Sequence, residues 1–309
     1  MNSTAHEIVG TTATGRVGTK RSEAPLTEFS LVMMALIWGV NFSVVKFGTT
    51  LLDPLAYNGL RVLLAAVLLT AIAGASRKPL PSRTTITALL ALGALGNGVY
   101  QFFFVEGIAL TRASDAALVV SASPAFIAII GRVRGVDRVG RRGAMGIAMS
   151  VAGIALVVFG TSRGADGHAS LYGDLLVLCG SLSWAIYTVL LKPFTERVTG
   201  AHLSAFTMIG GAVPLCVVAW PALASARWGA VPTSGWMAVS YSGVLALVIA
   251  YYFWYNGVRV IGPTRTAMYS NLQPVIAVIV AWVMLHETPT SWQAVGAACI
   301  IGGLVLTRT

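Results

Sequence analysis

The segment IWGVNFSVVK, residues 37–46, has a divergent copy in SWAIYTVLLK, residues 183–192. The two copies share a tryptophan and a lysine at an offset of 146 residues: Trp38 and Lys46 match Trp184 and Lys192. Further along the chain, residues of the same type recur at an offset of 150: Gly107 with Gly257, Pro124 with Pro274, Gly146 with Gly296, and Gly153 with Gly303. A single four-residue difference in length reconciles the two offsets. The chain therefore consists of two related halves.

The composition excludes a soluble protein. Of the 309 residues, 56% are hydrophobic and only 10% are charged, against about 25% charged residues in a soluble globular domain. Disordered chains are poor in apolar residues, whereas the mean hydropathy here is +0.77. The sequence therefore predicts an all-α integral membrane protein.

Apolar runs of membrane-spanning length recur along the whole chain. A helix needs about 20 mostly apolar residues to cross the hydrocarbon core, where only a helix or a closed barrel satisfies its own backbone. Ten runs qualify: Phe29–Phe47, Pro54–Ala75, Thr84–Val105, Ala113–Gly131, Gly143–Gly160, Leu171–Leu191, Ala201–Trp220, Ser234–Tyr255, Thr266–Leu285 and Trp292–Thr307. The connections between them are too short for an extramembrane domain.

These runs divide the chain into residues 1–27, a polar segment predicted to be a disordered cytoplasmic tail, and two repeats, residues 28–160 and 171–308. Each repeat holds five helices. Because five is odd, the second repeat enters the membrane upside down relative to the first. Inverted repeats of this kind place a substrate site near the midplane between the halves. The predicted fold is ten transmembrane helices as two inverted five-helix repeats.

The positive charges give the orientation, because loops rich in Lys and Arg stay on the cytoplasmic side. With the N-terminus inside, 16 of the 21 Lys and Arg residues fall in the inner segments and three in the outer loops: Arg112, Arg163 and Arg227. Both termini are predicted to be cytoplasmic and the protein to lie in the inner membrane. The net charge of +10 then reflects topology and a lipid bilayer partner, and no nucleic acid is expected.

Several motifs resemble the EamA-type family of the drug/metabolite transporter superfamily. They are the early Trp38-Gly39 with Asn41, the stretch GIALTRAS at residues 107–114, Pro124 with its counterpart Pro274, and Leu-His-Glu at residues 285–287. The likeness covers roughly residues 28–308. It implies ten helices in two inverted repeats and, for most members, export of small metabolites. Bacterial amino-acid exporters are plausible relatives, although no motif selects them.

Arg61 is the strongest candidate for substrate binding. It lies seven residues into the second run, about 10 Å along a helix, where a charge costs about 2.5–3.5 kcal/mol on insertion scales. Such a residue either holds a substrate carboxylate in a wet cavity or extends outward to water or a helix end. Lys46 lies at the outer end of its helix, where extending its side chain outward to water is sufficient to explain it.

Polar and aromatic side chains form the remaining candidate site. Asn97, Tyr100, Gln101 and Phe104 share one face of the third helix. The complete substrate-binding set is Trp38, Asn41, Arg61, Asn97, Tyr100, Gln101, Trp184, Tyr187, Asn271 and Gln273. The alternative for these residues is packing and hydrogen bonding between helices. Residues 251–256, YYFWYN, fit an aromatic belt at the cytoplasmic interface or an inner gate.

Pro124 and Pro274 are predicted to be hinges for alternating access, or else static kinks. The sequence thus predicts a secondary transporter that exports small metabolites such as amino acids. An importer of the same fold and an intramembrane enzyme acting on lipids are the alternatives, although no catalytic or metal-binding constellation is visible. No cofactor is expected, the molecule is a monomer or homodimer, and proton coupling, uniport and exchange all remain open.

Overall fold

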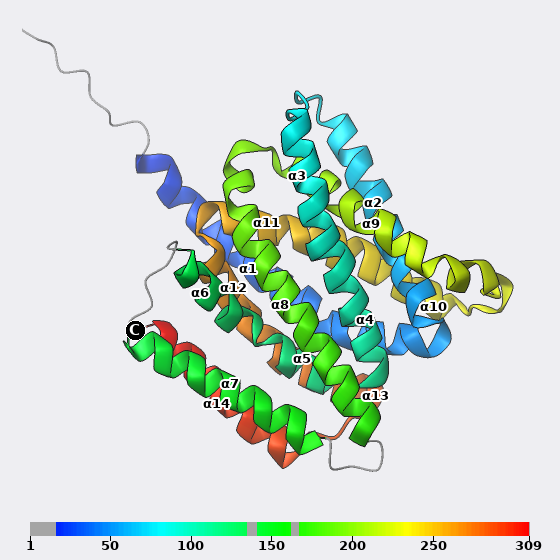
Figure 1. Ribbon diagram of the computed structural model, residues 1–309, viewed down its shortest axis with the longest axis vertical. Helices are drawn as coiled ribbons and strands as arrows, with labels where there is room; N and C mark the ends of the chain where they lie inside the picture. Colours follow the sequence, from blue (N-terminus) through cyan, green and yellow to red (C-terminus); the bar gives the residue numbers. More distant parts are fainter. Residues whose placement is uncertain (1–16, 135–140, 162–166, 309) are drawn as a thin grey trace, which may run out of the picture.

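In the computed structural model, residues 17–134, 141–161 and 167–308 are described, and within them the chain is helical with no strand (Figure 1). The first half comprises α1 (Val17–Leu51), α2 (Pro54–Ala75), α3 (Arg83–Gly93), the π-helical η1 (Ala94–Val99), α4 (Tyr100–Leu110), α5 (Ala113–Val120), α6 (Ser123–Val133) and α7 (Arg141–Thr161). The second half comprises α8 (Gly167–Arg197), α9 (Gly200–Ser225), η2 (Trp228–Ala230), α10 (Thr233–Ser240), the π-helical η3 (Tyr241–Ile249), α11 (Ala250–Val260), α12 (Pro263–Tyr269), η4 (Ser270–Leu272), α13 (Gln273–Leu285) and α14 (Ser291–Arg308).

Eight helical segments in the described ranges are long and apolar enough to cross a membrane. They are Leu26–Leu51, Pro54–Ala75, Arg83–Leu110, Ala113–Val133, Leu171–Arg197, Gly200–Ser225, Thr233–Val260 and Arg265–Leu285. These correspond to the predicted runs one to four and six to nine. The protein is therefore a multi-pass membrane protein, while a count of ten membrane-spanning helices stays a prediction.

The first helix begins earlier than the sequence predicted. Residues 1–16 of the proposed tail lie outside the described residues, but α1 already starts at Val17, so residues 17–27 are helical rather than disordered. Its early turns contain Lys20, Arg21 and Glu23, which have good helix propensity. A helix nucleated by the apolar run can propagate into such a segment, because extension costs far less than nucleation.

The predicted third and eighth runs each carry a π-helical segment in the middle. The segment η1 joins α3 to α4, and η3 joins α10 to α11, so that each run is continuous but locally widened. Wide turns of this kind are rare and occur frequently at functional sites. Their matching places in the two halves fit the predicted repeat.

The predicted fourth and ninth runs are both interrupted just before a proline. Pro124 lies in the first turn of α6, after the break at Ser121-Ala122, and Pro274 lies in the first turn of α13, after η4. Proline fits the first turn because its missing N–H has no partner there. The prolines therefore mark where each run is divided into two shorter helices.

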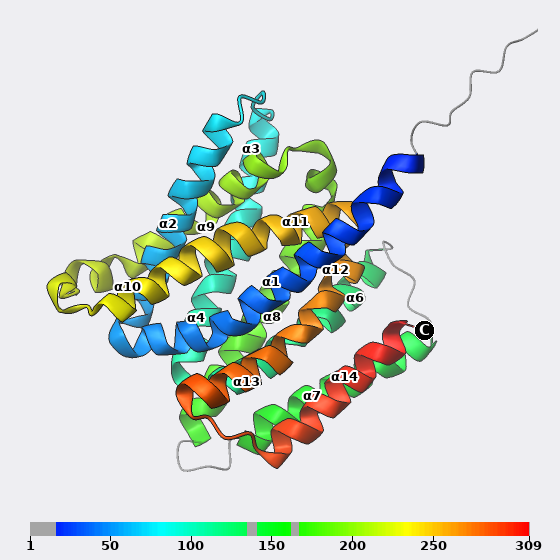
Figure 2. The ribbon, with the colours of Figure 1, turned by 180° about the vertical axis from the view of Figure 1, so that it is seen from behind.

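Helices α7 and α14, the fifth and tenth predicted runs, pack side by side at one edge of the molecule (Figure 2). A Cβ atom on Gly153 would lie 2.7 Å from the carbonyl oxygen of Gly296. Only glycine allows this backbone approach, which is how small residues bring membrane helices together.

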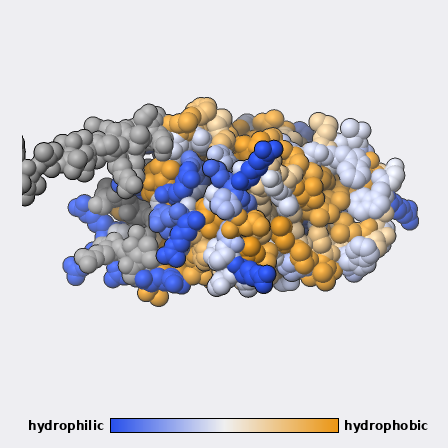
Figure 3. Space-filling model, turned by 90° about the horizontal axis from the view of Figure 1, so that it is seen from above, coloured by the Kyte–Doolittle hydropathy of each residue, from blue (hydrophilic) through white to orange (hydrophobic). Residues whose placement is uncertain are grey.

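The surface has the pattern of a membrane protein. In Figure 3 orange hydrophobic residues dominate the face shown, and blue hydrophilic residues concentrate toward the side where the grey atoms lie. Large exposed apolar side chains include Val67, Val217, Trp220 and Val283, which are 59–70% exposed. Such exposure suits contact with lipid and would be unusual in water.

Candidate functional site

A cavity in the middle of the molecule is lined by residues from both halves. The helices α1, α2, α4, α5 and α6 contribute from the first half, and α8, η3, α11, α12, η4 and α13 from the second. Its polar and aromatic lining includes Trp38, Asn41, Arg61, Tyr100, Gln101, Ser123, Trp184, Tyr251, Trp254, Ser270 and Gln273. Cavities with apolar walls and a few converging polar groups are typical of small-molecule sites.

Arg61 is completely buried and supplies the positive charge in the cavity wall. Its Nε donates to Asn58 Oδ1 at 3.1 Å, and its Nη2 donates to Gln101 Oε1. Its Nη1 has no hydrogen-bond partner within the described residues. The guanidinium is thus held by two neutral acceptors, and one of its nitrogens, Nη1, has no partner among the described residues, although a buried charge is costly without one.

Gln101 links Arg61 to the second half of the molecule. Its Oε1 accepts from Arg61, and its Nε2 donates to the Tyr251 hydroxyl at 2.9 Å. Asn58 in turn donates from Nδ2 to the backbone carbonyl of Gln101 at 2.8 Å. This chain of bonds fixes which end of the Gln101 amide faces the guanidinium, so that Arg61 is held in one orientation.

Aromatic rings form the rest of the wall. Trp38 lies 6.0 Å from Trp184, 5.7 Å from Tyr251 and 5.6 Å from Trp254, measured between ring centroids. Tyr100 packs 5.0 Å from Trp184. Edge-on and tilted contacts at these distances stabilise aromatic clusters. The result is a largely apolar compartment beside one buried cation.

Much of the lining consists of residues that match each other across the repeat. At the offset of 150, cavity residues of the first half pair with cavity residues of the second: Gln101 with Tyr251, Phe104 with Trp254, Ala117 with Ala267, Val120 with Ser270, and Ser123 with Gln273. Trp38 and Trp184 pair at the offset of 146. The cavity therefore lies between equivalent parts of the two halves.

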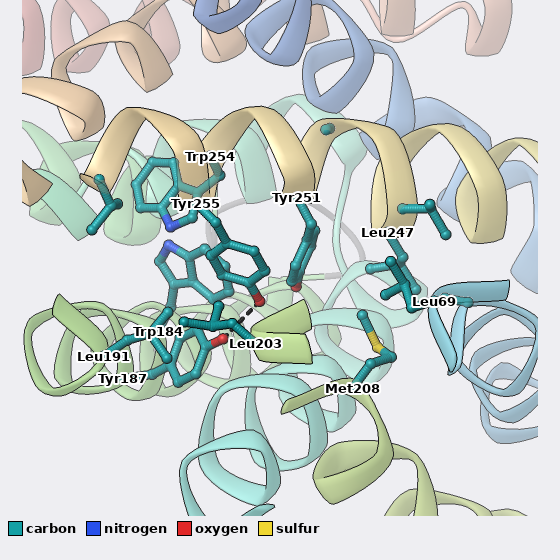
Figure 4. Packing of buried hydrophobic residues seen from close by; sticks show 14 of the residues in the cluster. Leu69, Trp184, Tyr187, Leu191, Leu203, Met208, Leu247, Tyr251, Trp254 and Tyr255 are labelled. Atoms are coloured by element: carbon teal, nitrogen blue, oxygen red, sulfur yellow. Dashed lines mark hydrogen bonds between the residues drawn. The ribbon is translucent and has the colours of Figure 1, made fainter. Parts of the chain in front are cut away.

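A tyrosine pair lies next to cavity residues and beside a second pocket. The hydroxyls of Tyr187 and Tyr255 are 2.7 Å apart, and Figure 4 shows them pointing toward one another beside Trp184. Tyr255 also lines the second pocket, together with Arg259 and Ser204. On the cavity side, Tyr187 packs 5.3 Å from Trp184 and Tyr255 packs 5.7 Å from Tyr251, measured between ring centroids.

The opposite end of the molecule is closed by polar contacts. The Lys46 ammonium donates to three carbonyl oxygens at the end of α4: those of Ile108, Ala109 and Thr111, at 3.1, 3.0 and 2.6 Å. The Glu287 carboxylate accepts from the first backbone N–H groups of α5, those of Ala113 and Ser114, at 2.9 and 3.0 Å. These are the favourable positions for a cation at a helix C-terminus and an anion at an N-terminus.

The structure brings together most of the predicted substrate-binding residues. Those that line the cavity are Trp38, Asn41, Arg61, Tyr100, Gln101, Trp184 and Gln273, with Pro124. The other predicted residues lie elsewhere. Tyr187 belongs to the tyrosine pair, and the buried Asn97 lies beside Tyr255. Asn271 lines a separate groove with Arg265, and Pro274 lines an apolar groove between α13 and α14.

The cavity residues outside the predicted set include two large aromatic side chains. Tyr251 and Trp254, only 2% and 1% exposed, line the cavity, whereas the sequence favoured an aromatic belt at the cytoplasmic interface for residues 251–256, with an inner gate as the alternative. A position at the membrane interface fits Tyr252, which is 58% exposed. The repeat held the missing signal, because Tyr251 lies 150 residues after Gln101, which was itself a candidate.

The side chains in the cavity wall have the chemistry needed to bind a small molecule. Within the described residues no group of three His, Cys, Asp or Glu residues is placed to hold a metal ion. The described cavity wall combines one guanidinium, neutral amides, hydroxyls and aromatic rings. This arrangement can hold an anionic group at one end and an apolar body at the other.

Comparisons with known proteins agree with this geometry. An uncharacterized transporter of Archaeoglobus fulgidus is 29% identical over 91% of this chain and 96% of its own. A probable amino-acid metabolite efflux pump of Salmonella typhimurium is 26% identical over 90% of this chain and 93% of its own. A solved crystal structure, 21% identical, covers 93% of this chain and 97% of its own with a TM-score of 0.65, so the fold is shared.

The family model describes both halves of the chain. The EamA-like transporter family matches twice, over residues 26–159 and 171–309. The boundaries of these matches lie close to those of the two repeats predicted from the sequence. The chain belongs to the EamA-like transporter family.

Proposed function

We propose that the protein is a secondary transporter that exports small metabolites, amino-acid metabolites among them, by alternating access across the inner membrane. The observation that carries the proposal is the buried Arg61 guanidinium, which has an unpartnered Nη1 and faces a cavity between the two halves. A charge at this depth is expensive unless it serves a partner or a substrate. The substrate therefore offers Arg61 a carboxylate or a similar anionic group.

The proposed architecture is ten helices in two inverted five-helix repeats, with both termini cytoplasmic. Its support is the double family match, the π-helical segments at matching places, and the repeat-related pairs around the cavity. The cytoplasmic termini rest on the 16-to-3 distribution of positive residues. Near-equivalent halves are the basis of rocking around a fixed central site.

The proposed moving parts are the two interrupted runs. Pro124 and Pro274 follow the breaks between α5 and α6 and between α12 and α13, and a few residues at such helix ends absorb the change between states. Export, rather than import, is supported by the similarity to the Salmonella typhimurium relative, a probable amino-acid metabolite efflux pump.

Efflux from proteoliposomes tests the proposal. Vesicles loaded with labelled amino acids and related carboxylates are expected to lose label faster with the protein than without it. Arg61→Gln should abolish this efflux while the folded protein remains in the membrane, and Arg61→Lys should restore it only partly, because an ammonium cannot reproduce the guanidinium geometry. Arg83→Gln, at an exposed arginine, is the matched control. Undiminished efflux by the Arg61→Gln protein would refute the role of Arg61, and no efflux of any compound would refute transport.

A further inference from the structure

We infer that the cavity selects small organic monoanions, namely carboxylates with an aromatic or apolar body and no ammonium group, over zwitterionic amino acids and organic cations. The inference rests on the proposed transport function and narrows its substrate class. Two features carry it: the sign of the fixed charge in the cavity wall, and the kind of polar atom left without a partner there.

The cavity wall carries an uncompensated positive charge. Arg61 is its ionised residue, and among the described residues no Asp or Glu lines the cavity. The ion pairs recorded in the described structure lie elsewhere, between Arg112 and Glu287 and between Lys192 and Glu196. A monoanion neutralises Arg61, whereas a zwitterion brings a second charge that has no carboxylate to pair with.

The unpartnered polar atoms in the wall are mainly donors. Within the described residues, Arg61 Nη1 and Trp254 Nε1 lack hydrogen-bond partners, and both can only donate. Ser123 Oγ, which can donate or accept, is also unpartnered. A carboxylate is an acceptor at both oxygens and suits this set. An ammonium group, which only donates, does not.

Two of the three side-chain amide oxygens in the wall already accept a hydrogen bond. Gln101 Oε1 accepts from Arg61, and Asn41 Oδ1 accepts from Ser242 Oγ at 2.7 Å. The Gln273 amide also lines the cavity, but a neutral oxygen holds an ammonium less strongly than a carboxylate does. The tryptophan faces offer cation–π contacts, which replace only part of the hydration that a buried ammonium loses.

The aromatic cluster defines the body of the ligand. Trp38, Trp184 and Trp254 lie within 6.0 Å of one another by ring centroid, and the Trp38 Nε1 donates to the Ala246 carbonyl at 2.9 Å. Trp38 therefore presents ring edges and faces rather than a free donor. An aromatic or branched apolar group next to the carboxylate can pack against the side of this cluster that lines the cavity.

Three probes with the same phenyl group separate the alternatives: 3-phenylpropionate, L-phenylalanine and 2-phenylethylamine. Binding to the full-length protein in nanodiscs is followed by quenching of tryptophan fluorescence, to which the three cavity tryptophans contribute. We expect 3-phenylpropionate to bind at least tenfold more tightly than phenylalanine, and 2-phenylethylamine to bind most weakly. Arg61→Gln should weaken 3-phenylpropionate at least tenfold without weakening 2-phenylethylamine, and Arg83→Gln should change neither.

Arg61→Lys, which keeps the charge, provides a second variant in case the glutamine variant unfolds, and it should preserve the order of the three affinities. The inference is overturned if phenylalanine binds as tightly as 3-phenylpropionate, if 3-phenylpropionate does not bind, or if Arg61→Gln binds it normally. Efflux of the same probes keeps the two proposals apart. Transport of phenylalanine without transport of 3-phenylpropionate refutes the anion preference alone, whereas failure of every labelled metabolite to move refutes transport.

Discussion

Replacing Lys46 by methionine is expected to open the cavity toward the outside. Lys46 closes one end of the molecule by donating to three carbonyl oxygens at the C-terminal end of α4. Its repeat counterpart Lys192 makes a single backbone contact at 3.4 Å, to Arg259, and a 2.8 Å ion pair with Glu196. The two ends are thus held by repeat-related lysines. The contacts of Lys46 with the carbonyl oxygens hold its end more strongly than the contacts of Lys192 hold the other end.

The magnitude follows from these contacts. Hydrogen bonds of charged groups contribute about 1.5–3 kcal/mol each, but bonds that share one ammonium are not additive. Allowing about 3 kcal/mol for all three, loss of Lys46 changes the ratio of the two states by roughly 100-fold. The Lys192 pair is partly solvent-exposed, with the Glu196 side chain 62% exposed, and such pairs contribute at most about 1 kcal/mol. Loss of Lys192 should therefore change the ratio no more than about fivefold.

Labelling of a single cysteine measures this ratio. Cys179, Cys216 and Cys299 are first replaced by alanine, and Ser270→Cys places a thiol in the cavity wall. An impermeant thiol reagent added outside the cells should label Lys46→Met at least tenfold faster than the parent protein. Lys192→Met should slow labelling by a smaller factor. An equal or larger effect at Lys192, or no effect at Lys46, would refute the reasoning, provided that surface expression is unchanged.

Three further predictions concern packing, hinges and the tyrosine pair. Gly93→Ala places a Cβ against the Thr207 carbonyl and should cost about 1–3 kcal/mol of stability, whereas Gly74→Ala, with open space around it, should gain up to about 1 kcal/mol. Equal midpoints in thermal unfolding would contradict this. Pro124→Ala and Pro274→Ala should shift cavity labelling in opposite directions and slow turnover more than they weaken binding, and unchanged labelling and turnover would reduce both prolines to static kinks. Tyr187→Phe removes a 2.7 Å hydrogen bond, contributing about 0.5–1.5 kcal/mol, and should speed labelling from the cytoplasmic face, which is the outer face of inverted vesicles, several-fold; an unchanged rate would show that the pair is no barrier.

The sequence predicted those parts of the site that depend on repetition and on charge in an apolar run. Trp38 and Trp184 were selected because they match across the halves, and Arg61 because of its depth; all three line the cavity. Repetition, and the depth of a residue within an apolar run, can both be recognised in the sequence. They can be recognised without knowing how the helices cross.

The positions of the misplaced residues depend on local helix geometry and on contacts between helices, which a regular helical period does not describe. Asn97 was assigned to the same face as Gln101, but Asn97 lies in η1, whose π-helical turns change the angle between residues on the two sides. Tyr251 was assigned to an interface because a span boundary fixes depth only approximately, and the π-helical η3 lies just before it. Lys46 was interpreted as extending toward water, whereas the carbonyl oxygens that it contacts belong to another helix.

The central claim is that Arg61 holds a carboxylate in a cavity between the two halves. A structure of the protein with bound 3-phenylpropionate, determined by electron cryomicroscopy in nanodiscs, tests it most directly. Carboxylate density is expected within hydrogen-bonding distance of Arg61 Nη1, with the phenyl ring packed against the cluster of Trp38, Trp184 and Trp254. Ligand density outside this cavity, or in the cavity without contact to Arg61, would contradict the account.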